Sequence, residues 1–93
     1  MTENAKEKWV ISLGGSLVVP DGGVDVQFLK KFNQFIRQKV AKGWRFFIVT
    51  GGGATSRHYQ NAAKKVRGDL VRDDVDWIGI HVTRLNAHLI RSI

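Results

Sequence analysis

The chain has 93 residues, of which 43% are hydrophobic and 25% are charged, with one proline, ten glycines and no cysteine. This composition is typical of one globular domain with a thin core, and it excludes a disordered, collagen-like, membrane-spanning or disulfide-stabilised protein. The first eight residues alternate charges and have no apolar stretch like that of a signal peptide, so we expect a cytoplasmic location.

The net charge indicates an anionic partner. Fifteen Lys and Arg residues against eight Asp and Glu residues give +7, and residues 26–68 contain ten basic residues and no acidic one. Such a surface favours nucleic acid, an acidic membrane or a phosphorylated metabolite. The alternative is a solvated helix surface in a piece of a larger protein, and charge alone does not decide between them.

The first half of the chain predicts a strand, a loop and a helix. Residues 8–13 are rich in β-branched and apolar side chains, which predicts a strand that two glycines end. Residues 17–23 contain a proline and an Asp-Gly-Gly turn, which predict a loop. A helix follows, with Asp25 as its N-cap and Gly43 as its C-terminal stop. Its apolar face repeats at a spacing of three and four residues through Phe28, Leu29, Phe32, Phe35, Ile36 and Val40.

The second half predicts another strand and two more helices. Residues 44–50 form a nearly continuous aromatic and β-branched run, typical of a strand covered on both faces, and three glycines follow it. A second helix is expected from these glycines to Gly68, and residues 69–76 are an acidic connection. The last helix runs to Ile93. Apolar positions on these two helices are Tyr59, Ala62, Ala63 and Val66, and then Ile78, Val82, Leu85 and Leu89.

The order of elements predicts an α/β fold. A strand, a helix and a strand joined by one crossover imply a parallel pair, and parallel sheets need several strands with helices on both faces. Two strands are too few, and no stop signal follows the last apolar stripe. We therefore expect residues 1–93 to be the N-terminal part of a single larger domain, cut at its C-terminal end, with residues 1–7 flexible. The rival is a small self-contained βαβα module.

Glycines follow both predicted strands. In open parallel sheets, ligands bind beyond the carboxyl ends of the strands, and glycine lets backbone N–H groups approach an anion closely. Glycines 14–15 and 51–53 therefore predict a phosphorylated ligand, although each loop alone fits a tight structural turn. Neither loop has the spacing of a P-loop or of the dinucleotide-binding motif.

Two side chains after the triple glycine carry groups that can bind an anion or a metal ion. Arg57 lies one helical turn beyond the glycines, where a guanidinium reaches back to an anion at the same helix end, or is simply solvated. His58 has no partner at the spacing of a metal site or a catalytic triad, so we interpret it, with His81 and His88, as surface or packing histidine and predict no metal site.

Three sequence strings carry a resemblance to a known family. They are Ile-Ser-Leu-Gly-Gly-Ser at residues 11–16, Val-Thr-Gly-Gly-Gly-Ala-Thr-Ser-Arg-His-Tyr at 49–59, and Asp-Trp-Ile-Gly-Ile-His-Val-Thr-Arg-Leu-Asn-Ala at 76–87. In this order the chain resembles the amino acid kinase superfamily, and within it the archaeal-type uridylate (UMP) kinases. The resemblance implies the start of a three-layer αβα sandwich and transfer of the γ-phosphoryl group of ATP to UMP, giving UDP for pyrimidine nucleotide biosynthesis.

The resemblance also implies roles for the glycines around the phosphates. Gly14 and Gly15, with Ser16, would form the loop around the transferring phosphate, and Gly53 and Arg57 would contact the phosphates of ATP. Backbone N–H groups and an arginine suit phosphoryl transfer, which needs alignment and neutralisation of spreading negative charge beside Mg²⁺. The cofactor implied is thus Mg²⁺ with ATP. No residue is assigned a catalytic proton-transfer role.

The resemblance implies that two further residues bind UMP. Gly52 would contact UMP, and Asp76 would accept hydrogen bonds from the ribose hydroxyls; without the family, Asp76 fits a helix N-cap before Trp77 equally well. Ser12 stands where many superfamily relatives have a lysine aimed at the phosphates, so other residues must supply that charge. Because family members are more than twice as long, the isolated piece is expected to be inactive. The resemblance also implies a homo-oligomer, since relatives form hexamers, and no membrane partner is expected.

Two alternatives remain open at this stage. Another superfamily kinase, such as an isopentenyl phosphate kinase, typically follows its glycines with Ser-Phe-Gly-His, where this chain has Ala-Thr-Ser-Arg at residues 54–57. A small nucleic-acid-binding module would use the positive charge and stacking aromatics. Against it, Phe46 and Phe47 are consecutive in a run that is typical of a buried strand, so at most one of them would face a ligand.

Overall fold

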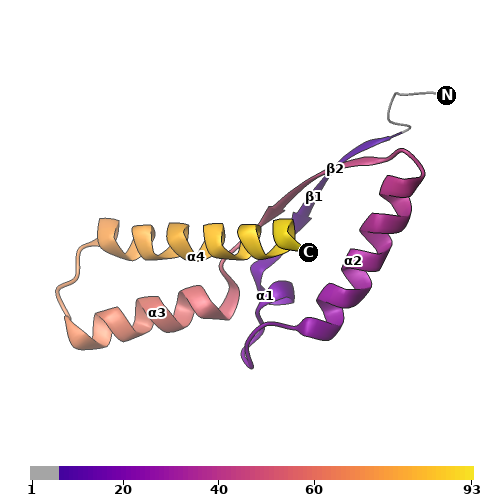
Figure 1. Cartoon of the computed structure of the whole chain (residues 1–93). Helices are drawn as coiled ribbons and strands as arrows, with labels where there is room; N and C mark the ends of the chain where they lie inside the picture. The colour runs from indigo at the N-terminus through magenta and orange to yellow at the C-terminus, as the bar shows by residue number, and fades with distance from the viewer. Residues whose placement is uncertain (1–6) are drawn as a thin grey trace.

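The computed structural model describes residues 7–93, which form two strands and four helices (Figure 1). Strands β1 (Lys8–Leu13) and β2 (Arg45–Thr50) lie side by side, helices α1 (Gly15–Val18) and α2 (Val26–Ala41) connect them, and α3 (Gly53–Val66) and α4 (Arg72–Ser92) form a helical hairpin after the sheet. The parallel α/β arrangement expected from the sequence is therefore confirmed.

The two strands are parallel and in full register. Lys8 pairs with Arg45 at one end and Leu13 with Thr50 at the other, so both carboxyl ends reach the same edge of the sheet. Parallel strands must be joined by a crossover, which α1 and α2 supply. The register places the two glycine segments, which follow Leu13 and Thr50 directly, at a common edge, as the sequence predicted.

Helix α2 begins and ends where the sequence indicated. The Asp25 carboxylate accepts a hydrogen bond of 2.9 Å from the backbone N–H of Phe28, which satisfies one of the free donors of the first turn. Gly43 follows the helix with φ of 94°, a left-handed conformation that glycine adopts without a steric penalty. These end signals position the helix over one face of the sheet.

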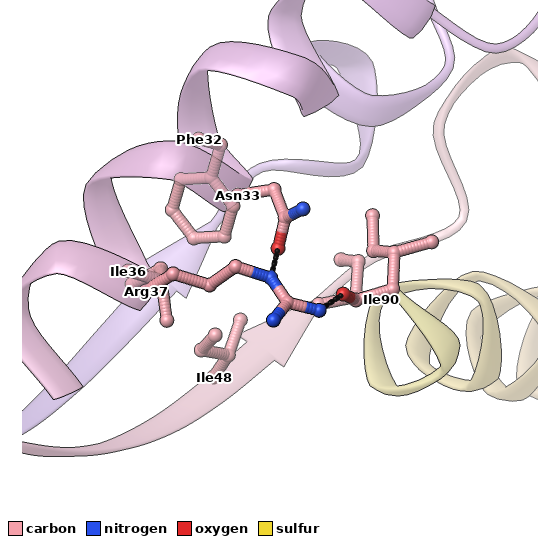
Figure 2. Close-up of a pocket in the computed structure, with 7 residues that line it drawn as sticks. Phe32, Asn33, Ile36, Arg37, Ile48 and Ile90 are labelled. Carbon is pink, nitrogen blue, oxygen red and sulfur yellow. Dashed lines mark hydrogen bonds between the residues drawn. The ribbon is translucent and has the colours of Figure 1, made fainter. Parts of the chain in front are cut away.

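Helix α2 and the end of α4 cover the same sheet face. Phe32 and Ile36 of α2, Ile48 of β2 and Ile90 of α4 surround an apolar cavity of about 160 Å³. Figure 2 shows Arg37 reaching from α2 across this cavity, where it donates a hydrogen bond of 2.7 Å to the Ile93 carbonyl. The core next to it is small, and its buried members are Leu13, Val18, Val19, Leu29 and Ala54.

The opposite sheet face is bare, which corrects the prediction that residues 44–50 are covered on both sides. Val10, Phe47 and Val49 are 72%, 68% and 58% exposed, because no helix among residues 7–93 packs against them. Of the two consecutive phenylalanines, Phe46 is half-buried and only Phe47 faces outward. Several apolar side chains of the helical hairpin also remain exposed, namely Tyr59, Val66, Trp77, Ile80 and Leu85.

Two boundary predictions were wrong. The expected loop at 17–23 begins with α1, a single turn closed by hydrogen bonds such as that from the N–H of Val19 to the Gly15 carbonyl at 2.8 Å. Residues 72–76 of the expected connection at 69–76 are helical, and Asp73 and Asp74 lie in the first turn of α4, where negative charge is favourable. Of residues 1–7, expected to be flexible, 1–6 lie outside the described part. The carbonyl of Glu7 accepts a hydrogen bond from Arg45 and so extends the sheet.

Candidate phosphate-binding site

The two glycine segments contact each other directly at the carboxyl edge of the sheet. A Cβ atom added to Gly15 would lie 2.7 Å from the carbonyl carbon of Gly51 and 2.8 Å from the nitrogen of Gly52, closer than real Cβ atoms approach. Residue 15 must therefore be glycine, because two backbone segments pass each other here and leave no room for a side chain. We call this contact of residues 14–16 with residues 51–53 the glycine junction.

Gly53 is fixed by its backbone conformation as well as by its neighbours. It has φ of 63°, and a Cβ atom on it would come within 2.8 Å of the Val19 carbonyl oxygen. The N–H of Ala54 donates to that same oxygen at 2.9 Å, so α3 is tied to the end of α1. A right-handed residue, Gly52, followed by left-handed Gly53 turns successive N–H groups toward one side, an arrangement that binds anions in other proteins.

Several backbone donors of the glycine junction remain available. The N–H groups of Gly52 and Gly53 have no acceptor among residues 7–93, in keeping with the free donors of a helix N-terminus. Gly14 is exposed, with open space around the position of an added Cβ, and Ser16 is also exposed. The junction thus has donors, and on the Gly14 side it has room for a ligand.

Asn86 of α4 supports the glycine junction and was missed by sequence reasoning. It is only 3% exposed, and its side-chain nitrogen donates to the carbonyl oxygens of Gly51 at 2.9 Å and Gly52 at 3.1 Å. The helical spacing could have identified it, because Asn86 follows buried Val82 by four residues and so lies on the inward face of the helix. A polar residue at such a position indicates a buried hydrogen-bond partner.

Arg57 lies beside the glycine junction and is open to solvent. Its guanidinium makes a long contact of 3.4 Å with the Asp21 carboxylate, and the two side chains are 53% and 90% exposed. An ion pair this exposed contributes little to stability, so the guanidinium is available to a competing anion. The three histidines, His58, His81 and His88, are all exposed, as their sequence context predicted.

Asp76 lies apart from the glycine junction, in a groove between α3 and α4. It is in the second turn of α4, whose N-cap is Val71, so the alternative of Asp76 as a helix N-cap is wrong. Val82 of α4 packs close to Gly52, and Asp76 is about 9 Å further along the helix from it, at 1.5 Å per residue. The groove measures about 460 Å³, and its lining includes Ser56, Gln60, Asp76, Gly79, Thr83 and Arg84.

The described residues do not supply a metal cage. Among residues 7–93 no three His, Asp or Glu side chains come together as ligands for an ion. Magnesium is commonly bound through one or two carboxylates together with the phosphates of a substrate. No helix in this same part of the chain has both the length and the apolar character needed to cross a membrane.

Comparison with known proteins agrees with this geometry. The model of the amino acid kinase family matches residues 7–93. The chain belongs to the amino acid kinase family.

Individual relatives come from archaea. The chain is 41% identical over 83 residues to a uridylate kinase of Methanosarcina barkeri. The matched segment covers 89% of this chain and 34% of the relative. It is 40% identical over 87 residues to a uridylate kinase of Thermoplasma acidophilum, covering 94% of this chain and 36% of the relative. The chain thus spans about a third of the length of the curated relatives it matches.

Proposed function

We propose that this chain forms the phosphate-binding part of a uridylate kinase, which transfers the γ-phosphoryl group of ATP to UMP. The observation that carries the proposal is the glycine junction, where two glycine segments meet at the carboxyl edge of a parallel sheet with free N–H groups. Sequence similarity to uridylate kinases supports UMP as the acceptor. The proposal concerns the complete protein, in the cytoplasm and as a homo-oligomer.

The junction suits the charge that develops in phosphoryl transfer. Such reactions need alignment of the nucleotides and stabilisation of negative charge spread over the phosphate oxygens. Gly14, Gly15 and Ser16 would surround the transferring phosphate, and Gly53 would donate its N–H to ATP. Arg57 would exchange its weak contact with Asp21 for a phosphate oxygen.

The groove between α3 and α4 suits the sugar of the acceptor nucleotide. Gly52, at the junction end of this hairpin, would contact UMP through its N–H, and Asp76 would accept hydrogen bonds from the ribose hydroxyls. A carboxylate accepts without donating, so it recognises a diol and repels a second phosphate. Mg²⁺, bound with ATP, would neutralise phosphate charge; the chain's own residues bind and orient the nucleotides.

A kinetic assay of the protein translated from the complete reading frame tests this function. ADP formation from ATP and Mg²⁺ is measured with UMP, CMP and isopentenyl phosphate as acceptors, and we expect turnover with UMP alone. Asp76→Ala should raise KM for UMP about tenfold with little change for ATP, and Arg57→Ala should do the reverse. Turnover confined to isopentenyl phosphate, or none with any acceptor, would contradict the proposal.

A further inference from the structure

Asn86 is the polar side chain that fixes the orientation of the glycine junction. It comes from the middle of α4, is almost fully buried, and donates to two consecutive carbonyl oxygens, those of Gly51 and Gly52. Because both partners are acceptors, the amide nitrogen and not the amide oxygen must face the loop. One side chain therefore holds two peptide groups in the segment that precedes α3.

Because the peptide bond is planar, holding a carbonyl also fixes the direction of the N–H group in the same peptide. In a trans peptide the C=O and the following N–H point in opposite directions, and the described residues contain no cis peptide bond. The carbonyl of Gly51 shares its plane with the N–H of Gly52, and the carbonyl of Gly52 with the N–H of Gly53. When Asn86 holds both carbonyls toward α4, both N–H groups must turn away from α4.

We propose that Asn86 is a positioning residue that presents the N–H groups of Gly52 and Gly53 to the phosphates of the bound nucleotides. This inference rests on the proposed kinase function and adds to it a residue that touches neither nucleotide. The two N–H groups have no acceptor among residues 7–93, so they are the donors left for an anion.

A glycine segment needs such a clamp. Glycine has no Cβ to restrict its backbone, so three in succession leave the peptide planes free to rotate. On the α1 side, the bond from Ala54 to the Val19 carbonyl fixes the start of α3. On the other side, Asn86 donates to the carbonyls of Gly51 and Gly52. The Gly52 carbonyl also accepts a longer hydrogen bond of 3.4 Å from the N–H of Ser56, so only the Gly51 carbonyl depends on Asn86 alone among the described contacts. Donors aligned before the ligand arrives bind it without reorganisation.

A titration of the ¹⁵N-labelled chain with tripolyphosphate tests this role, because the probe carries the phosphate chemistry without base or ribose. In the wild type we expect the amide signals of Gly52 and Gly53 to shift on binding. Asn86→Ala should bind tripolyphosphate at least about tenfold more weakly, since one well-placed hydrogen bond to a charged group is worth that much. Arg37→Ala is the matched control, because it removes another long-range side-chain bond to a backbone carbonyl, far from the glycines; its affinity should stay within about twofold.

Asn86→Asp supplies a readout that a purely structural role would not change. At neutral pH its carboxylate loses both donated bonds and repels the carbonyls, so binding should be weak. Burial against carbonyl oxygens raises the pKa of a carboxyl group, and its protonated form donates one hydrogen bond again. The ratio of variant to wild-type affinity should therefore rise as the pH falls, and the same ratio for Arg37→Ala should stay flat.

The outcomes separate the two proposals. Wild-type shifts at Gly52 and Gly53 with unchanged affinity in both Asn86 variants would overturn the role of Asn86 and leave the kinase function standing. Absence of those shifts in the wild type would overturn the role of Asn86, whereas the kinase function is decided separately by the turnover assay with the complete protein. If neither variant gives the dispersed amide signals of a folded chain, Asn86 acts on the fold as a whole and the positioning role is overturned.

Discussion

The glycine junction and the bare sheet face are built on the same two strands, yet their surroundings differ completely. At the junction, β1, α1, α3 and α4 converge within hydrogen-bond distance, and Ala54 and Val19 are almost fully buried. On the bare face, Phe47 and Val49 are more than half exposed. The difference shows that contacts within the described residues determine the shape of the glycine junction, whereas nothing in the described chain determines what covers the second face.

The largest effect is expected from Gly53→Ala, which attacks the junction. The new side chain would be strained at φ of 63° and would collide with the Val19 carbonyl oxygen. We expect the free energy of unfolding to fall by about 3 kcal/mol or more, measured by denaturant titration. Gly68→Ala is the matched control, because an added Cβ there meets nothing within 4 Å, and its stability should be unchanged. Equal stability of the two variants would mean that the junction is not the rigid part of the fold.

The next contrast compares neighbouring residues on opposite faces of β2. Ile48→Ser removes an apolar side chain of β2 that lies between α2 and the end of α4, and it should lower the free energy of unfolding by about 2 kcal/mol or more. Phe47→Ser should change the free energy of unfolding by less than about 0.5 kcal/mol, because Phe47 is exposed. It should also reduce self-association in sedimentation experiments, since it breaks an apolar patch. A large loss of stability in Phe47→Ser would show that this face is covered in solution.

A third variant separates folding from binding within the junction. Gly14→Ala should leave stability within about 0.5 kcal/mol of the wild type, because the new Cβ enters open space at φ of −57° and ψ of 136°. That space is where the proposed phosphate lies, so affinity for tripolyphosphate should fall about tenfold. Isothermal titration calorimetry measures the affinity, and denaturant titration of the same preparation measures the stability. Unchanged affinity with unchanged stability would remove Gly14 from the binding site.

Sequence patterns predicted the parts of this fold that depend on local rules. The strand at residues 8–13, the Asp25 cap and the stop at Gly43 each follow from side-chain period or turn chemistry, and each is confirmed. The common edge of the two glycine segments followed from the crossover rule for parallel strands. The carboxyl edge of the sheet could therefore be identified as the candidate site from the sequence alone.

The remainder depends on contacts that no local pattern encodes. Helix α1 is one turn and has no period to detect, and the start of α4 is acidic and was interpreted as a connection. The composition of β2 indicates a buried strand but not which segment covers it. The role of Asn86 depends on where α4 packs, because a single asparagine in a helix has the same sequence signature whether it faces water or a glycine loop.

The smallest effect is expected from Asp21→Ala, which frees Arg57 at the edge of the junction. The pair is exposed, so stability should change by less than about 0.5 kcal/mol, while affinity for tripolyphosphate should rise about two- to threefold as a competing carboxylate is removed. Asp69→Ala is the control, because it breaks the exposed pair with Arg67 at the far end of α3 and changes the net charge equally. An equal rise in both variants would mean that net charge, and not release of Arg57, governs the binding. A rise in Asp21→Ala alone would place the Arg57 guanidinium at the phosphates. Salt screens charges that are far apart, so only a charge close to the bound phosphates would change the affinity.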